Sequence, residues 1–475
     1  MNFPEGLAFD DVLLVPQRSS IKSRSDVSLK THLTKRITLN MPLISSNMDT
    51  VTEDKMAIEM ARNGGIGIIH RYCSIKDQTE MVRRVKRAEA YIIAKPYTTT
   101  KTSTIGELRN QIKNLNVHSF LVINEENKLL GLITNRDIKF REDNELVGEC
   151  MTPRSLLHTG HPGIDVEAAK NIMKINRIQK LPIVNEDSVV TGLICFKDIE
   201  RIENRPMATL DKDGQLRCGA AIGVKDDYLD RAAALIDAGV DVLVIDIAHG
   251  HSDSCINTIK ELKKQYPDLD VIAGNIATYC GAKDLILAGA DAIKCNIGAG
   301  SICTTRLVSG SGVPQLTALL DAAPVCKEYG VPLISDGGNR NSGNICKALA
   351  AGASTIMLGR MIAGTDESPG NIMIRNEKRV KIIRGMASYA ANLSNAKKQG
   401  LLEPDSINSH MEGVDGYVPY TGPVKDTLNQ ICNGVRSGMS YTGAINIPEL
   451  QSKRKFIRIT NNGVIESGVH DILQS

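Results

Sequence analysis

A cysteine stands within a glycine-rich segment whose composition suits covalent chemistry. The segment reads N-I-G-A-G-S-I-C-T-T-R over residues 296–306, and its cysteine is Cys303. Gly298 and Gly300 let the backbone turn tightly and expose its amide and carbonyl groups. Nearby N–H dipoles favour the thiolate, which is the nucleophilic form of cysteine. The sequence therefore predicts Cys303 as a nucleophile, whereas we expect the other ten cysteines to be structural.

Glycines at two further positions could bring backbone amides to a phosphate. Gly337 and Gly338 lie at the end of one apolar run, and Gly359 lies at the end of the next. Bare N–H groups at such turns bind anions, and this is a recurrent phosphate site in parallel α/β barrels. The alternative is that these glycines only allow tight turns. We expect a phosphorylated substrate to bind there.

Polar residues near two other predicted strand ends are weaker indicators of a functional site. Asp246 and Asn275 end two apolar runs, where they either contact a ligand or only cap the strands. His249 and His251 flank Gly250, but no third ligand follows at a spacing that suits a metal. No G-x-G-x-x-G follows a strand, so we do not expect a Rossmann nicotinamide domain.

Short apolar runs rich in β-branched residues recur along the chain, with helical stretches between them. Apolar residues repeat at i, i+3 and i+4 in segments 53–63, 227–238 and 342–351, which is the helical period. Eight near-continuous apolar strands favour a closed parallel (β/α)8 barrel over an open doubly wound sheet, whose edge strands would be more polar. The eight runs are 42–47, 64–70, 220–224, 242–248, 270–275, 291–297, 332–338 and 354–360.

A long insertion follows the second run and contains an internal repeat. Residues 118–138 align with residues 179–199, which places Asp137 and Asp198 at equivalent positions. Each copy joins two predicted strands through a polar turn and ends in G-L-I-x-x-x-D at the start of a helix. The insertion therefore predicts a separate domain built from two similar halves.

This repeat resembles a tandem cystathionine-β-synthase (CBS) module over residues 96–205. Such modules bind adenine nucleotides, with a hydroxyl residue and an aspartate that contact ribose. Thr134 and Asp137 match that pattern in the first copy, whereas Cys195 replaces the hydroxyl residue before Asp198 in the second. The alternative is that both aspartates only cap helices. The resemblance implies regulation by purine nucleotides, with Asp137 more important than Asp198.

Composition excludes several classes of function. The 475 residues have a net charge of +3 without a basic block, and Trp is absent, so we do not expect a nucleic-acid partner. No apolar run reaches the length of a membrane span. The 11 cysteines include no C-x-x-C, which favours a reducing compartment. With no signal peptide and no peroxisomal C-terminal tripeptide in the final LQS, we expect a cytoplasmic protein.

Taken together, the motifs resemble the IMP dehydrogenase/GMP reductase family across essentially the whole chain. The resemblance implies a TIM barrel formed by residues 1–95 and 206–475, with the CBS module at 96–205 inserted after the second strand. The matching strings are GSICTTR (300–306), MDTVTE (48–53), SDGG (335–338), ALAAGA (348–353), AGTDESPG (363–370) and RGMAS (384–388).

The resemblance also assigns roles to individual residues. In this family the nucleophilic cysteine bonds to C2 of a purine nucleotide, and Thr305 and Glu412 match the residues of its proton relay. Asp336 matches the acceptor for the ribose hydroxyls, and Asp246, Asn275 and Gly298 match positions on the cofactor side. Residues that match the rest of the substrate site, from phosphate to purine, are Ser46, Met48, Ser301, Gly337, Gly338, Gly359, Arg360, Arg384, Gly385, Met386 and Ala387.

A potassium ion and a homotetramer, or an octamer built from two of them, are implied in the same way. The family binds the ion through backbone carbonyls that match Gly298, Gly300 and Cys303. Residues Glu466, Ser467 and Gly468 match the segment that completes the site from a neighbouring subunit.

The choice between the two reactions depends on an absent arginine. Dehydrogenases hydrolyse the covalent adduct with an arginine, followed by tyrosine, on a flap that here spans residues 388–410. No arginine occurs between Arg384 and Arg436, and the only Arg-Tyr pair, Arg71-Tyr72, lies in a different part of the chain. Lys397 and Lys398 could act as bases only with strongly lowered pKa values.

We therefore expect a reductase most like the CBS-containing GMP reductases of trypanosomatids, which converts GMP to IMP and ammonia with NADPH. The alternatives are an IMP dehydrogenase that uses NAD, and a catalytically inactive sensor of purine nucleotides.

Overall fold

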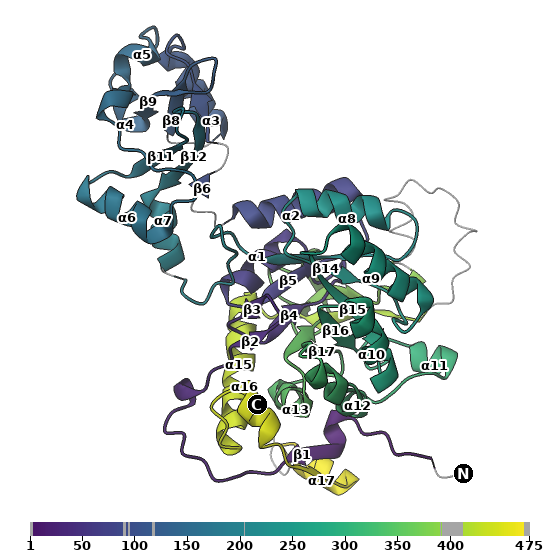
Figure 1. The fold of residues 1–475 in the computed structure, drawn as a ribbon. Coiled ribbons are helices and arrows are strands. Elements are labelled where there is room, and N and C mark those ends of the chain that lie inside the picture. The colour runs from purple at the N-terminus through teal and green to yellow at the C-terminus, as the bar shows by residue number, and fades with distance from the viewer. Residues whose placement is uncertain are drawn as a thin grey trace. The chain divides into compact units, whose positions relative to one another are not determined.

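The computed structural model describes residues 3–88, 92–93, 96–115, 119–203, 205–389, 391 and 412–469. It divides into two compact units (Figure 1). The first unit comprises residues 1–88, 207–211 and 216–475, and the second comprises residues 89–206 and 212–215. None of the helices in the described ranges has the length and apolar character needed to cross a bilayer.

The first unit is a closed barrel of eight parallel strands in the order β13-β14-β15-β16-β17-β18-β4-β5. Every predicted apolar run supplies one of these strands, so the predicted (β/α)8 fold is confirmed. The strands are β4 (Leu43–Ser45), β5 (Ile66–Ile69), β13 (Cys218–Ile222), β14 (Val242–Ile245), β15 (Asp270–Ile276), β16 (Ala292–Cys295), β17 (Leu333–Asp336) and β18 (Thr355–Leu358).

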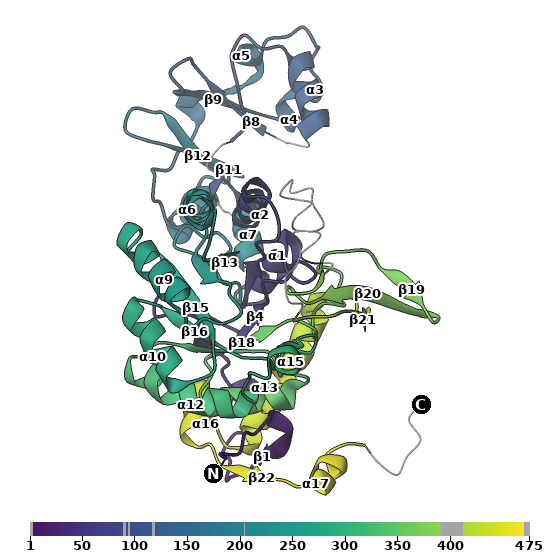
Figure 2. The same cartoon turned by 90° about the vertical axis from the view of Figure 1, so that its right-hand side faces the viewer.

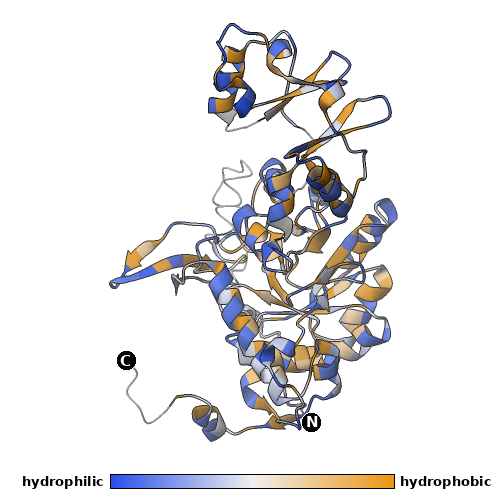
Figure 3. Ribbon diagram, turned by 90° about the vertical axis from the view of Figure 1, so that its left-hand side faces the viewer, coloured by the Kyte–Doolittle hydropathy of each residue, from blue (hydrophilic) through white to orange (hydrophobic). Residues whose placement is uncertain are grey.

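Helices cover the outer face of the barrel (Figure 1). Their apolar sides face the strands and their charged sides face solvent, so orange and blue alternate along them in Figure 3. They are α1 (Asp54–Arg62), α2 (Ile75–Arg87), α8 (Tyr228–Asp237), α9 (Asp253–Gln265), α10 (Tyr279–Ala288), α12 (Gln315–Glu328), α13 (Ser342–Ala351) and α15 (Val424–Tyr441).

Two apolar layers hold the barrel together. Alternate strand residues point inward, and Ile44, Val244 and Met357 belong to a fully buried cluster inside the barrel. Leu33 and Leu39 join that cluster from the hairpin of β2 (Thr31–His32) and β3 (Thr38–Leu39). The larger cluster lies between the strands and the surrounding helices. Because the interior is filled, the barrel has a packed core, and in barrels of this kind the functional loops lie at the carboxyl-terminal mouth.

Smaller elements extend the barrel unit. Strands β19 (Met373–Arg375), β20 (Lys378–Arg384) and β21 (Asp415–Pro419) form an antiparallel sheet that projects from it (Figure 2). Strand β1 (Val12–Leu14) pairs with β22 (Phe456–Arg458). The remaining elements are η1 (Phe9–Asp11), η2 (Arg24–Asp26), α11 (Thr305–Ser309), α16 (Ile447–Ser452) and α17 (Asn461–Glu466).

The second unit contains the internal repeat. Its first copy forms the antiparallel pair β8 (Ser119–Ile123) and β9 (Leu129–Thr134), and its second forms β11 (Lys180–Val184) and β12 (Val190–Cys195). One apolar cluster takes residues from both copies, among them Leu121 and Leu193. The other elements are β6 (Ile92–Ile93), β7 (Thr98–Thr99), β10 (Thr152–Pro153), α3 (Ile105–Leu115), α4 (Asn135–Ile138), α5 (Val147–Cys150), α6 (Val166–Ile175), α7 (Phe196–Glu203) and η3 (Arg154–Leu156).

Candidate active site

The cysteine segment connects β16 to α11 at the mouth of the barrel. Gly298 adopts a φ of +79°, and a Cβ there would lie 2.5 Å from Cγ of Arg306. Arg306 in turn donates hydrogen bonds to the carbonyl oxygens of Ile297 and Val313, which fixes the end of the loop. Glycine is therefore required at 298 both for its backbone conformation and for the space that Arg306 occupies.

Cys303 begins a short chain of hydrogen bonds. Its partly exposed thiol donates to Oγ1 of Thr305 at 3.1 Å, and that hydroxyl donates to Oε2 of Glu412 at 2.6 Å. A sulfur, a hydroxyl and a carboxylate in this order can pass a proton from the thiol to the carboxylate. The three predicted catalytic residues thus lie in direct contact, although Glu412 follows Thr305 by 107 residues.

Backbone hydrogen bonds hold three distant segments around the thiol. The Thr304 amide donates to the Glu412 carbonyl at 2.9 Å, and Cys303 forms a β-bridge with Gly413. The Glu412 amide donates in turn to the carbonyl of Ala387 at 3.2 Å. The cysteine segment, residues 412–414 and the R-G-M-A-S segment therefore form one rigid assembly.

Next to the cysteine segment lies a cavity of about 310 Å³, which we call the inner pocket. Gly337, Gly338 and Gly359 line it, with positive φ values at the first two. Its wall also carries Ser46, whose buried Oγ has no hydrogen-bond partner among the described residues. Predicted substrate residues in this wall are Ser46, Met48, Ser301, Asp336, Gly337, Gly338, Gly359 and Arg360.

Asp336 ends strand β17 and accepts two side-chain hydrogen bonds. Lys294 donates from Nζ at 3.0 Å and Asn275 from Nδ2 at 2.9 Å, both to Oδ2. Lys294 is only 5% exposed, and sequence reasoning missed it. The available signal was a lysine inside an otherwise apolar strand. The two donors fix the position of Oδ2 and leave the other carboxylate oxygen available to accept from hydroxyl groups.

The R-G-M-A-S segment is anchored from the opposite wall of the mouth. Arg384 contacts Oδ2 of Asp49 through Nε at 2.8 Å and Nη2 at 2.5 Å. The Asp49 amide approaches Sδ of Met386 at 3.4 Å. The guanidinium of Arg384 is therefore engaged by Asp49, while its neighbours Gly385, Met386 and Ala387 present the segment to the cysteine loop.

The Arg71-Tyr72 pair is distant from the R-G-M-A-S segment in sequence, but it lies beside that segment at the barrel mouth. The Tyr72 hydroxyl donates to the Met386 carbonyl at 2.8 Å, and Nε of Arg71 donates to Oδ2 of Asp246 at 3.1 Å. The carboxyl ends of parallel strands β5 and β14 meet at one rim, which explains the encounter. Burial lowers the pKa of Arg71, but Asp246, Tyr72 and Asp227 together raise it by more, so the pKa lies above its ordinary value.

Other predicted site residues are more scattered. His251 pairs with Asp284 at 2.9 Å, and no group of three metal-ligating side chains occurs within the described ranges. Glu466, Ser467 and Gly468 lie at and beyond the end of α17, where they are exposed. Lys397 and Lys398 lie outside the described residues, as does most of the flap segment.

In the second unit the two copies of the repeat differ at the positions expected to bind ribose. Asp137 accepts from the Thr134 hydroxyl at 2.8 Å and from the Thr134 amide at 2.7 Å, which closes a capping box on α4. At the equivalent place in the second copy, Nζ of Lys180 lies 2.8 Å from Sγ of Cys195. A cation therefore contacts the position where the first copy has a hydroxyl.

Comparisons with known proteins agree with this geometry. The model of the IMP dehydrogenase / GMP reductase domain matches residues 6–470. The chain is 48% identical to an inosine-5′-monophosphate dehydrogenase of Nitrosopumilus maritimus over the full length of both chains. It is also 48% identical to a GMP reductase of Leishmania donovani, over 99% of this chain and 97% of that one.

Among solved structures, a cysteine-to-alanine variant of GMP reductase from Trypanosoma brucei, in complex with guanosine 5′-monophosphate, superposes with a TM-score of 0.90. Its sequence is 44% identical, and the match covers 99% of each chain. The family model and these relatives cover almost every residue, which confirms the resemblance drawn from the motifs. The protein therefore belongs to the IMP dehydrogenase/GMP reductase family of oxidoreductases.

Proposed function

We propose that this protein is a GMP reductase that converts GMP to IMP and ammonia with NADPH. The observation that carries the proposal is the hydrogen-bonded chain from Cys303 through Thr305 to Glu412, together with the lack of arginine between Arg384 and Arg436. This series of hydrogen bonds suits the departure of an amine, because a leaving amine needs a proton donor. The missing arginine removes the usual base for hydrolysis.

The covalent step begins when the thiol gives its proton to Thr305, which passes one to Glu412. The Cys303 sulfur then bonds to C2 of the purine, and the amino group on that carbon leaves as ammonia after it takes a proton back through Thr305. A thioimidate on Cys303 remains. NADPH held near Asp246 and Asn275 would supply a hydride to C2, after which the C–S bond would break to release IMP and the Cys303 thiolate.

Substrate binding would divide the nucleotide between three sets of groups. The amides near Gly337, Gly338 and Gly359 would hold the 5′-phosphate, and Asp336 would accept from the ribose hydroxyls. The unpartnered hydroxyl of Ser46 and the segment around Met386 would contact the purine. Asp336, Ser46 and the three glycines line one pocket that also takes part of its wall from the cysteine segment, so they would bring C2 within reach of the sulfur.

On the cofactor side, the proposed residues are Asp246, Asn275 and Gly298. Oδ1 of Asn275 is buried and has no partner among the described residues, so it can accept a hydrogen bond from a bound dinucleotide. This orphaned acceptor supports a cofactor that lies across the barrel mouth. The preference for NADPH over NADH is part of the proposal.

The carbonyl oxygens of Gly298, Gly300 and Cys303 are the donors proposed for potassium. Neutral carbonyl oxygens suit a hard monovalent cation, and the Gly300 oxygen accepts the Cys303 amide at 3.2 Å. An ion bound there would hold the cysteine segment in place. The site would be completed in a homotetramer or octamer by Glu466, Ser467 and Gly468 of a neighbouring subunit.

IMP dehydrogenase is the second candidate, and the Arg71-Tyr72 pair favours it. This pair contacts Asp246 and Met386 at the mouth, so a guanidinium does lie near the proposed substrate. The ion pair with Asp246 raises the pKa of Arg71, which makes the guanidinium a poor base for water. For this reason we prefer the reductase.

The insertion over residues 96–205 is proposed as a CBS module through which purine nucleotides regulate the barrel. Its two similar halves and the capping box of Thr134 and Asp137 support this proposal. Oδ2 of Asp137 is engaged by Thr134, and its second oxygen could accept from a ribose hydroxyl.

One assay separates the candidate functions. The purified protein is incubated with GMP and NADPH, and separately with IMP and NAD, and the absorbance of the reduced cofactor is followed. Consumption of NADPH in the first mixture supports the reductase. Steady formation of NADH in the second mixture, without consumption of NADPH in the first, would overturn the reductase proposal in favour of the dehydrogenase. An unchanged absorbance in both mixtures would favour a nucleotide sensor.

A further inference from the structure

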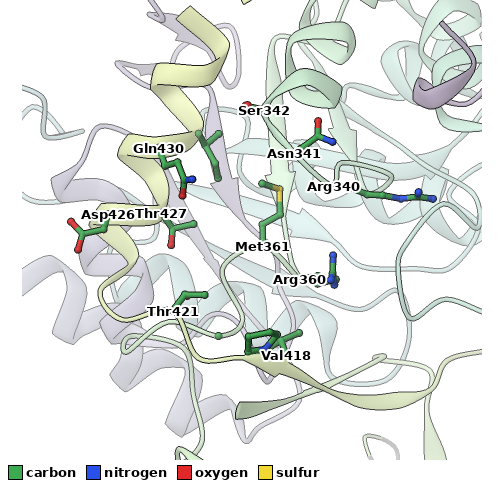
Figure 4. Close-up of a pocket in the computed structure, with 13 residues that line it drawn as sticks. Arg340, Asn341, Ser342, Arg360, Met361, Val418, Thr421, Asp426, Thr427 and Gln430 are labelled. Atoms are coloured by element: carbon green, nitrogen blue, oxygen red, sulfur yellow. The ribbon is translucent and has the colours of Figure 1, made fainter. Parts of the chain in front are cut away.

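A second cavity adjoins the inner pocket and has no role in the proposed reaction. This outer pocket has a volume of about 480 Å³ and lies between the start of α13, the end of β18, strand β21 and helix α15. Figure 4 shows Met361 in its centre, with Arg340 and Arg360 on one side and Thr427 and Gln430 of α15 on the other.

The two pockets meet at the end where the substrate phosphate is proposed to bind. Arg340, Arg360 and Met361 line both of them. Arg360 directly follows Gly359, one of the three glycines of the proposed phosphate site. A ligand whose first phosphate lies in the inner pocket could therefore extend a second group past these arginines into the outer pocket.

The charge of the outer pocket favours an anion. Arg360 is exposed, and no acidic side chain among the described residues pairs with it. Arg340 pairs with Asp10 at 3.0 Å, but both side chains are largely exposed, so this contact is weak. Asp426 is the one acid in the lining, and Figure 4 shows it on the far side of α15, pointing away from Met361.

Neutral hydrogen-bond donors complete the pocket. The hydroxyls of Thr421 and Thr427 and the amide of Gln430 line it. The N-terminus of α13, at Asn341 and Ser342, adds the partial positive charge of a ten-residue helix. Guanidinium, hydroxyl and amide donors around one cavity match the three acceptor oxygens of a terminal phosphate.

We propose that the outer pocket is a subsite for the β-phosphate of a purine nucleoside diphosphate. Such a ligand places its purine, ribose and first phosphate in the inner pocket and competes with GMP for the active site. The inference rests on the proposed function, because it uses the same phosphate position. It adds a class of inhibitor that acts directly at the barrel, independently of the inserted unit.

Protection of Cys303 from alkylation tests the subsite without relying on turnover. The full-length protein is treated with iodoacetamide without cofactor, and the Cys303 peptide is quantified by mass spectrometry at increasing GMP or GDP. A ligand in the inner pocket would cover this thiol directly, and any contribution from nucleotides bound in the inserted unit would be the same in the two α15 variants described below. We expect GDP to protect at concentrations within about tenfold of those needed for GMP.

Two charge variants on α15 provide the matched comparison. Gln430→Glu adds a negative charge to the outer pocket, whereas Asn429→Glu adds the same charge at the next, exposed residue, which does not line it. Repulsion of the β-phosphate should raise the half-protecting GDP concentration about tenfold in Gln430→Glu. It should change less than about twofold in Asn429→Glu, and GMP protection should stay the same in both.

The outcomes separate the two proposals. If GMP protects Cys303 but GDP does not, or if both variants shift GDP protection equally, the subsite is refuted and the proposed reaction stands. If GMP does not protect the thiol at any concentration, the proposed function itself fails.

Discussion

The hydroxyl of Thr305 donates to Oε2 of Glu412 at 2.6 Å, while the Glu412 carbonyl accepts from the backbone amide of Thr304. Side chain and backbone thus bind the same two segments to each other. Residues 412–414 thus carry the carboxylate and also fix the cysteine loop. The relay and the nucleophile therefore cannot move independently, which suits a proton transfer that needs a fixed distance.

Interrupting the relay should slow the reaction without preventing substrate binding. In Thr305→Val the hydroxyl is lost while the side-chain volume is nearly kept. We expect kcat for GMP reduction to fall by about 10² to 10³, and KM for GMP to change by less than about threefold. Thr305→Ser restores the hydroxyl and should recover most of the rate. Steady-state oxidation of NADPH measures both, and an unchanged kcat in Thr305→Val would exclude the relay.

Removing the nucleophile should separate binding from chemistry. Cys303→Ala deletes the sulfur but leaves the inner pocket and Asp336 in place. Turnover should become undetectable, whereas the dissociation constant for GMP should change by less than about threefold, since phosphate and ribose contacts remain. Calorimetric titration with GMP tests the retained binding, and the NADPH assay tests the loss of turnover. Turnover that persists in the variant would remove the covalent mechanism.

The lysine behind Asp336 should support both the fold and substrate affinity. Lys294 is buried beneath the mouth and donates to Asp336. Lys294→Met leaves that carboxylate with Asn275 as its remaining side-chain donor, so we expect a loss of about 3 kcal/mol in stability and a clear rise in KM for GMP. Lys294→Gln keeps one donor and should lose less of both. Thermal unfolding and steady-state kinetics provide the readouts, and equal effects of the two substitutions would contradict this role.

The strands were predictable because a parallel barrel buries both faces of each strand. Runs such as 242–248 and 354–360 are therefore almost continuously apolar, and each became a barrel strand. The position of Lys294 was not predictable in this way. A lysine inside an otherwise apolar strand was a visible signal, but its partner Asp336 belongs to the next strand along the barrel and could be identified only from the fold.

Contacts between remote segments were the part that sequence could not supply. The motifs indicated Thr305 and Glu412 through a family resemblance, but only the fold brings their side chains together. The same holds for Arg71. It is far from the other site residues in sequence, but the barrel places it beside Asp246. Sequence spacing thus indicates which residues could do chemistry, and strand order decides which of them meet.

Buried thiols should make the barrel less stable at alkaline pH. Burial raises the pKa of Cys326 and of Cys346 to about 12. In the unfolded chain these thiols ionise near pH 9, so between pH 9 and 12 the unfolded state binds fewer protons and stability falls as pH rises. Each thiol contributes about 1.4 kcal/mol per pH unit in that window. The double variant Cys326→Ala/Cys346→Ala should therefore show a shallower decline of melting temperature from pH 9 to 11. An identical decline in both proteins would refute this origin.

The two copies of the repeat should respond unequally to mutation. Asp137 closes a capping box with Thr134, and its other oxygen can accept from a ligand, whereas Lys180 contacts Cys195 at the equivalent place in the second copy. The Lys180 ammonium therefore contacts the side chain that stands where the first copy has the Thr134 hydroxyl. Asp137→Ala should therefore blunt the effect of added ATP or GTP on GMP reduction severalfold more than Asp198→Ala. Since loss of the cap also weakens α4, Asp137→Asn serves as the control, because it keeps a capping acceptor while it removes the charge. If both aspartates mattered equally, the difference at Cys195 would have no functional meaning.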